Sequence, residues 1–236
     1  MSSSVVWSQG LHVWMPLPQS MTLSLAEPGR AGYRLGQIRR AGSVGSIVAL
    51  LLALVLTLLK VPIRPLFLLA GLVAVVAALA CLGVPRNLKT PGPRLVFRRR
   101  YGLYYLLQFL EGWRKQIFVA FAGFLLAGKY EAPLKTMILL WILTQTILWI
   151  AATPVGRLID RVGERPVLMV YFLCLTLCFF GYAFVTDRWL LYVIYVVDHS
   201  FFVLAIALTT YVNRIAPPSE HTATLSMGVA MNHVAA

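Results

Sequence analysis

Long apolar runs, separated by short polar segments, constrain the fold of this chain more than any other feature of its sequence. A helix of about 20 apolar residues crosses the hydrocarbon layer of a membrane, which is about 30 Å thick. With 59% hydrophobic and 12% charged residues, the composition is that of a multi-span membrane protein. We therefore predict an all-α, polytopic bundle of membrane helices. The predicted spans are residues 5–26, 42–59, 66–84, 101–127, 134–152, 167–185 and 189–212, followed by a partial span at 222–236.

The positive charge of the chain is concentrated at the ends of these runs. A net charge of +13 is compatible with nucleic-acid binding, but this distribution is more typical of membrane orientation and anionic lipid. One set of alternate loops holds 14 of the 21 lysines and arginines, and the opposite set holds 5. The richer set comprises residues 27–41, 85–100, 153–166 and 213–221, and we predict that it is cytoplasmic. The predicted partner is therefore the lipid bilayer and not nucleic acid, and the predicted location is the cell (inner or plasma) membrane.

A charged segment at residues 154–166 joins two of the apolar runs. Gly156 has no side chain, so a second helix can approach closely there. Asp160 is suited to the positive N-terminal end of a neighbouring helix. Gly163 can adopt the positive φ angle that ends a helix, and Pro166 suits the first turn of the next one. A plainer interpretation is a positive loop that only orients the protein in the membrane.

This charged segment resembles the loop signature of the major facilitator superfamily of secondary transporters. The matching residues are Gly156, Leu158, Asp160, Arg161, Gly163 and Arg165. Glu164 departs from the signature, because it places an acid where a base is common. The resemblance implies a cytoplasmic gate made of Gly156, Arg157, Asp160, Arg161, Gly163 and Arg165. By the pseudo-symmetry of such folds, the segment is expected to contact the start of the second span, around residues 42–46.

The resemblance also implies an organisation into domains. The chain is similar to a truncated twelve-helix pattern and covers about helix 4 to helix 11. Residues 1–84 are then three spans at the end of an N-terminal bundle, and residues 101–236 are a C-terminal bundle of four spans and a partial fifth. Residues 85–100, rich in proline and arginine, are the basic cytoplasmic linker between them.

Polar side chains lie deep in several of the predicted spans. Gln108, Glu111 and Lys115 follow the spacing of one helix face, and Arg114 lies three residues from Glu111. The other polar residues at a similar depth are Gln145, Asp198, His199, Asn232 and His233, and His12 and Gln19 are candidates for the opposite wall. Charges at this depth are costly unless they face protein or a water-filled cavity. We therefore predict a substrate or coupling pathway of Gln108, Glu111, Arg114, Lys115, Gln145, Asp198 and His199, with internal ion pairs, mainly from Asp198 to Arg114 or Lys115, as the alternative.

These features favour transmembrane secondary transport of a small solute by alternating access, without catalytic residues, metal or cofactor. Glu111 with Arg114 and Lys115 leaves one surplus positive charge, which suits an anionic substrate unless an acid of another helix neutralises it. His199, or a buried Glu111 or Asp198, could couple transport to protons. One alternative is a truncated or degenerate transporter relative that acts as a scaffold. A less favoured one is an integral membrane enzyme that modifies lipids, which would need clustered acids or histidines at a membrane face.

Overall fold

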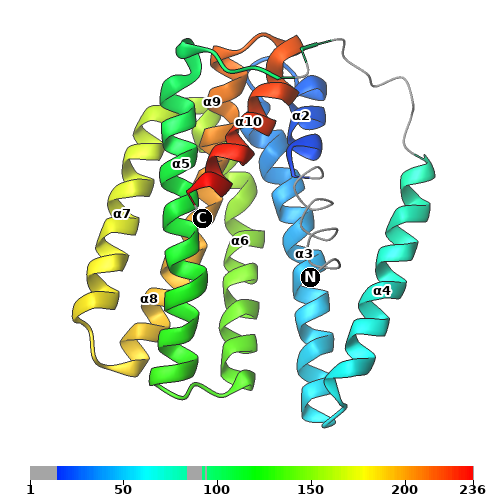
Figure 1. Ribbon diagram of the computed structural model, residues 1–236, viewed down its shortest axis with the longest axis vertical. Coiled ribbons are helices and arrows are strands. Elements are labelled where there is room, and N and C mark those ends of the chain that lie inside the picture. Colours follow the sequence, from blue (N-terminus) through cyan, green and yellow to red (C-terminus); the bar gives the residue numbers. More distant parts are fainter. Residues whose placement is uncertain (1–14, 84–91, 94, 236) are drawn as a thin grey trace.

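The chain folds into a bundle of helices in this computed structural model, which describes residues 15–83, 92–93 and 95–235 (Figure 1). The described part contains no strand. Its α-helices are α2 (Pro16–Leu25), α3 (Ala31–Leu58), α4 (Ile63–Ala80), α5 (Gly102–Ile117), α6 (Leu134–Val162), α7 (Glu164–Phe184), α8 (Arg188–Ser200), α9 (Ile206–Ile215) and α10 (His221–Val234). The shorter elements are η1 (Cys81–Gly83), η2 (Arg99–Tyr101), the π-helical η3 (Phe118–Ala122) and η4 (Leu125–Lys129), η5 (Phe201–Ala205) and η6 (Pro218–Glu220).

Four of these helical stretches are long and apolar enough to cross a membrane. They are Ala31–Leu58, Leu134–Val162, Glu164–Phe184 and Arg188–Ile215, the last of which combines α8, η5 and α9. The predicted spans 42–59, 134–152, 167–185 and 189–212 lie inside or across these four stretches. The predicted span 66–84 corresponds to a shorter apolar helix, Phe67–Gly83, and the predicted span 101–127 to α5 with its π-helical continuation. Residues 5–14 of the first predicted span and residues 85–91 of the predicted linker lie outside the described residues.

Two predicted loops are helical instead. Residues 31–41, assigned to a basic turn, form the first turns of α3, so this helix begins eleven residues before the predicted span at 42–59. The charged segment 154–166 is also helical except at Gly163, because α6 continues to Val162 and α7 begins at Glu164. Gly163 has a φ of +83°, as the sequence predicted for the residue that ends a helix. Hydropathy marks the lipid-embedded part of a helix, and both helices continue beyond that part through arginine-rich sequence.

Glycines bring α3 and α6 into backbone contact. A Cβ atom at Gly156 would overlap the carbonyl oxygen of Gly32, and one at Gly36 would overlap the carbonyl oxygen of Ala152. The predicted contact at residues 42–46 is therefore wrong in position, since a Cβ at Gly45 would meet no atom within 4 Å. The charged segment does contact the start of the helix, but that start lies at Ala31 and not at residue 42.

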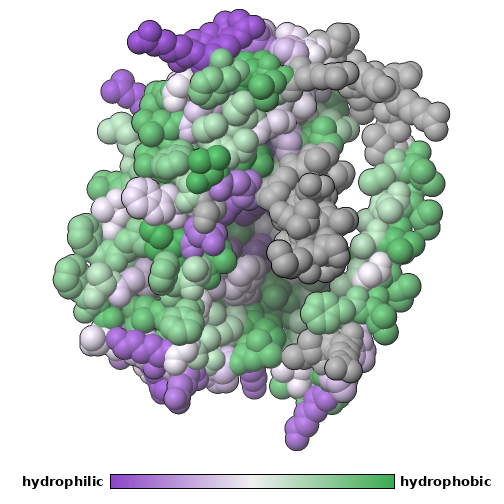
Figure 2. Space-filling view, in the orientation of Figure 1, coloured by the Kyte–Doolittle hydropathy of each residue, from purple (hydrophilic) through white to green (hydrophobic). Residues whose placement is uncertain are grey.

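Among the described residues, buried apolar side chains of the remaining helices form two clusters, of which the smaller joins α8 to the π-helical elements after α5, and one helix takes part in neither. Large buried side chains of α5, α6, α7 and α9, among them Tyr104, Leu148, Tyr171 and Leu208, fill the bundle. The exception is α4, which stands apart from the bundle beyond α3 (Figure 1). Apolar side chains cover its surface (Figure 2), and Phe67 and Leu68, for example, are about three-quarters exposed, at 73% and 74%. Such a surface suits the hydrocarbon of a membrane or other membrane helices.

Candidate functional site

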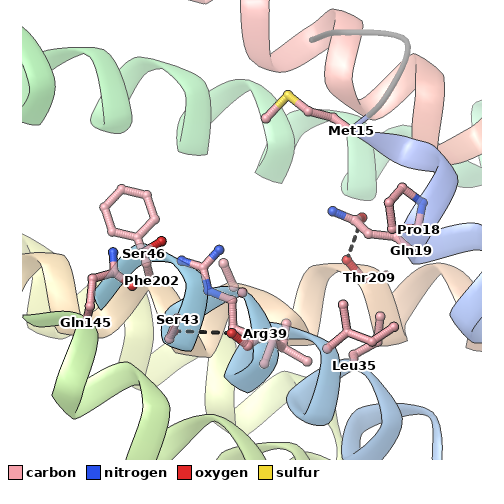
Figure 3. A pocket seen from close by; sticks show the side chains of 14 residues that line it. Met15, Pro18, Gln19, Leu35, Arg39, Ser43, Ser46, Gln145, Phe202 and Thr209 are labelled. Carbon is pink, nitrogen blue, oxygen red and sulfur yellow. Dashed lines mark hydrogen bonds between the residues drawn. The ribbon is translucent and has the colours of Figure 1, made fainter. Parts of the chain in front are cut away.

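A cavity of about 420 Å³ lies between the N-terminal helices α2 and α3 and the later elements α6, η5 and α9. Such a volume is typical of small-molecule sites. Figure 3 shows side chains from both groups of helices around the opening. The lining residues are Met15, Pro18, Gln19, Leu35, Ile38, Arg39, Gly42, Ser43, Ser46, Gln145, Phe202, Ala205, Ile206 and Thr209.

Some polar side chains of the cavity form hydrogen bonds within the protein, whereas the charge of Arg39 has no ion-pair partner in the part that the structure describes. Thr209 Oγ1 donates a hydrogen bond of 3.1 Å to Gln19 Oε1 across the gap between α9 and α2. Ser43 Oγ donates one of 3.2 Å to the carbonyl oxygen of Arg39. Arg39 itself is exposed to the cavity, and its guanidinium has no ion-pair partner among the described residues. In Figure 3 it lies near Ser46, Gln145 and Phe202, at one end of the site.

Sequence reasoning anticipated only part of this lining. Gln145 was predicted as a pathway residue, and Gln19 was expected on the opposite wall; both line the cavity. Arg39, Ser43 and Ser46 were missed, because the first was assigned to a cytoplasmic turn and the others to the end of a span. Their spacing of four and three residues places all three on one face of a helix, and this was the signal available in the sequence. His12 lies outside the described residues.

Four buried residues from three helices form an ion cluster behind this cavity, namely Glu111, Arg114, Tyr171 and Asp198. Arg114 Nη2 lies 2.6 Å from Glu111 Oε1 and 2.7 Å from the Tyr171 hydroxyl. That hydroxyl donates a 2.7 Å hydrogen bond to Glu111 Oε2, and Arg114 Nη1 lies 3.5 Å from Asp198 Oδ1. The three charged residues are therefore paired with each other, which was the alternative expected for Asp198 and Arg114.

Phe202 contacts both the ion cluster and the cavity. It lines the cavity, and the guanidinium carbon of Arg114 lies 3.9 Å from the centroid of its ring. Glu111, Arg114 and Asp198 are not among the described lining residues of the cavity. A rotation of the Phe202 side chain would therefore change the contact between the ion cluster and the cavity.

The other predicted pathway residues lie around the same region in separate environments. Lys115 Nζ donates a 2.6 Å hydrogen bond to Asn232 Oδ1 of α10, where α5 and α10 cross closely at Gly112. Gln108 donates a 3.2 Å hydrogen bond to the Tyr104 hydroxyl within α5. His199 packs among three rings, with centroids 5.0 Å away for Trp141 and Phe202 and 5.2 Å away for Phe118. The structure therefore brings Glu111, Arg114 and Asp198 together, and places Gln145 in the cavity.

The predicted gate residues join α6 to the N-terminus of α3. Asp160 accepts hydrogen bonds of 2.7 Å from Gly32 N and 2.8 Å from Tyr33 N, so its charge meets the positive end of the helix dipole. The guanidinium carbon of Arg157 lies 5.0 Å from the centre of the Tyr33 ring. Arg161 and Arg165 are exposed, on either side of the turn at Gly163.

Glu164, which departs from the family signature, has a specific partner in this chain. Its Oε2 lies 3.0 Å from Nη2 of Arg214, at the end of α9. The Glu164 side chain is 9% exposed, whereas that of Arg214 is 63% exposed. The acid at this position therefore ties the start of α7 to the end of α9.

A second set of contacts at the same end joins the start of α5 to the turn before α10. Glu220 Oε1 lies 2.6 Å from Nη2 of Arg98, and its Oε2 accepts a 2.6 Å hydrogen bond from the Tyr101 hydroxyl. Arg100 Nη2 lies 3.0 Å from the same Oε2. The Tyr101 hydroxyl, with Arg100 and Arg98, lowers the pKa of Glu220 from its ordinary value of 4.5.

Comparison with known protein families decides the class of the chain. The family model described as Major Facilitator Superfamily matches residues 5–236. The chain belongs to the major facilitator superfamily. The family consists of transporters that move small solutes across membranes, and both the all-α architecture and the apolar helices of this member agree with that. No curated protein and no solved structure matches the chain.

Proposed function

We propose that this member of the major facilitator superfamily is a secondary transporter that binds a small solute in the cavity between α3 and the later helices α6 and α9. The observation that carries the proposal is the position of the cavity, which has helices from both sides of the basic linker in its walls. In transporters of this general type, the site lies between two helical units that rock against each other. The two units here are residues 1–84 and 101–236, joined by residues 85–100.

Alternating access would require the contact between α3 and α6 to open and close. The contact at Gly32 and Gly156 brings two backbones together, and Asp160 fastens the start of α3 to the end of α6. Separation of these helices would break two hydrogen bonds and one close packing contact. The gate would then consist of Asp160, Gly156 and Arg157, with Arg161, Gly163 and Arg165 at the turn beside them. We assign this end to the cytoplasm of a cell membrane from the distribution of lysine and arginine.

Coupling to protons would use the ion cluster. Two carboxylates, Glu111 and Asp198, share one guanidinium, and Asp198 Oδ2 has no hydrogen-bond partner among the described residues. Protonation of Asp198 would weaken its ion pair with Arg114. The packing of Arg114 against Phe202 at the cavity wall would change as a result. This arrangement supports proton coupling more directly than His199, which is enclosed by rings.

The test is uptake into liposomes that contain the purified chain, with a panel of labelled anionic, zwitterionic, cationic and neutral solutes and no ATP. Gln145→Leu removes an amide from the cavity wall, and we expect it to reduce uptake of the accepted solute at least tenfold. Gln116→Leu is the matched control, because Gln116 is exposed on α5 and does not line the cavity. Equal loss in both variants would count against the cavity as the site.

The same panel distinguishes the other candidate functions. A folded chain that moves no solute of the panel under any ion gradient would favour the scaffold interpretation of a degenerate relative. A change in added phospholipids, with no solute movement, would favour a lipid-modifying enzyme.

A further inference from the structure

We propose that the cavity binds a small organic anion, a carboxylate with an apolar body, and that Arg39 is the residue that recognises its charge. The inference rests on the proposed function of the cavity and adds the class of solute to it. Three observations carry it: the charge pairing of the whole chain, the polar groups around Arg39, and the apolar groups at the other end of the site.

No acid of this chain is available to neutralise Arg39. The sequence has eight Asp and Glu residues, and all of them lie in the described part, since residues 1–14, 84–91, 94 and 236 contain none. Six of them serve other positive groups: Glu27 pairs with Arg30 and Arg34, Glu111 and Asp198 with Arg114, Glu164 with Arg214, Glu220 with Arg98 and Arg100, and Asp160 with the start of α3. Asp187 binds the Leu190 amide at the start of α8, and Glu131 lies in the turn before α6, at the opposite end of that helix from the gate.

The charge of Arg39 therefore remains unbalanced inside the bundle. The neighbouring ion cluster does not supply a partner, because Glu111 and Asp198 both pair with Arg114 and neither forms an ion pair with Arg39. A guanidinium that faces a cavity between helices carries a desolvation cost unless it meets an anion or water there. An anionic solute would remove this cost, whereas a cationic solute would meet direct repulsion.

The groups around Arg39 suit a carboxylate. A guanidinium presents a planar fork of N–H donors that matches the two oxygens of a carboxylate. In Figure 3 the Ser46 hydroxyl and the Gln145 amide lie near the same end of the cavity and can supply further donors. Neither side chain has a hydrogen bond to another described residue, in contrast to Thr209 and Gln19, which bond to each other.

The remaining wall is apolar and favours an organic body over an inorganic ion. Leu35, Pro18 and Met15 line the part of the cavity away from the Arg39 guanidinium, and Phe202 lies beside it (Figure 3). Ile206 is a further apolar residue of the lining. A cavity of about 420 Å³ is larger than a phosphate or sulfate ion would fill. In a carboxylate attached to an aromatic or aliphatic group, the charged end would bind Arg39 and the apolar body would contact the apolar wall.

The test is binding to the purified full chain in lipid nanodiscs, measured by calorimetry with acetate, benzoate, octanoate, inorganic phosphate and benzamide. Benzamide is the neutral counterpart of benzoate and has nearly the same shape. We expect benzoate or octanoate to bind at least tenfold more tightly than both benzamide and phosphate. Arg39→Gln should weaken that binding by about tenfold or more, and Arg39→Lys should weaken it less, because charge remains while the fork is lost.

The matched control is Arg40→Gln. Arg40 is the adjacent exposed arginine on α3, but its guanidinium lies 5.1 Å from the ring of Trp149 and does not line the cavity. Its replacement should leave carboxylate binding unchanged. The proposal is overturned if no carboxylate of the set binds, if benzamide or phosphate binds as tightly as benzoate and octanoate, or if Arg39→Gln and Arg40→Gln behave alike.

Measurements of binding and of uptake test this inference and the proposed transport function, on which it rests, separately. Carboxylate binding that depends on Arg39, without uptake into liposomes, would support the anion site and contradict the transporter. Uptake of neutral or cationic solutes, without carboxylate binding, would support the transporter and contradict the anion site.

Discussion

At the scale of single residues, Asp160 shows how one side chain can join two membrane helices. Its carboxylate accepts two backbone hydrogen bonds at the N-terminus of α3 while its own backbone belongs to the last turn of α6. The amides at the start of a helix have no partner within that helix, so an acid from elsewhere can take the place of a cap. The residue preceding α3, Arg30, provides no side-chain cap of its own.

Replacement of Asp160 should therefore lower stability. We expect Asp160→Ala to reduce the free energy of unfolding by about 1–2 kcal/mol, in the range of lost helix caps, and Asp160→Asn to cost less because an amide oxygen still accepts. Thermal unfolding of the chain in detergent micelles measures this. Arg161→Gln, at the exposed neighbouring position, is the control and should be close to neutral; an equal loss in both would contradict the capping role.

Arg39 illustrates what residue identity alone does not reveal. Arg39 lies next to Arg40 in a basic stretch of sequence, which is typical of a loop, and it was interpreted as part of a basic turn. Only the extension of α3 back to Ala31 places it on this helix, about two helical turns before Ser46 and beside the cavity. The distinction between Arg39 and Arg40 depends on a rotation of about 100° around the helix axis.

At the scale of helices, the crossing of α3 and α6 depends on glycine. We expect Gly156→Ala to destabilise the chain by about 1–3 kcal/mol, since the added methyl group would overlap the backbone of Gly32. Gly45→Ala adds the same methyl group to α3 where no atom lies within 4 Å, and it should be neutral or stabilising by up to about 1 kcal/mol. Unfolding temperatures of the two variants in the same detergent provide the comparison, and a reversed order would refute the crossing.

The contact between Glu220 and the start of α5 predicts a dependence on pH. Because Tyr101 and the two arginines lower the pKa of Glu220 in the folded chain, its contribution to stability is present above the ordinary pKa of 4.5 and is lost as the pH falls through the folded value. Glu220→Gln should therefore be less stable than the unmodified chain at pH 7. This difference should shrink below about pH 4.5. Unfolding temperatures measured from pH 7 to pH 3 test it, and a constant difference across that range would contradict the assignment.

At the scale of the whole molecule, hydropathy and charge predicted the class of fold and the approximate positions of the spans. They did not predict where helices end, because α3 and α6 continue through arginines that a hydropathy pattern assigns to loops. They also did not predict which polar residues meet. The partners of Glu111 and Arg114 include Tyr171 and Asp198, 57 to 84 residues along the chain from Arg114, and such pairing is set by helix packing rather than local sequence.

Proton coupling is a property of the whole molecule, and the ion cluster predicts its behaviour. Asp198→Asn keeps the shape of the side chain but removes its exchangeable charge beside Arg114. We expect it to abolish accumulation of solute driven by an imposed proton gradient while leaving exchange of solute across the membrane. Uptake by this variant that matches the unmodified chain at every external pH would contradict the coupling role.

The proposed transport requires the cavity to open in turn to either side of the membrane. The direct measurement is labelling of Ser46→Cys by a membrane-impermeant thiol reagent, in a chain whose Cys81, Cys174 and Cys178 are replaced by serine, using sealed vesicles of both orientations. Val48→Cys, at a 62% exposed position of α3 outside the cavity lining, is the control and should stay unlabelled from both sides. We expect Ser46→Cys to react from both sides, and a saturating transported solute to slow the reaction. Reaction from one side alone under every condition would rule out alternating access through this cavity.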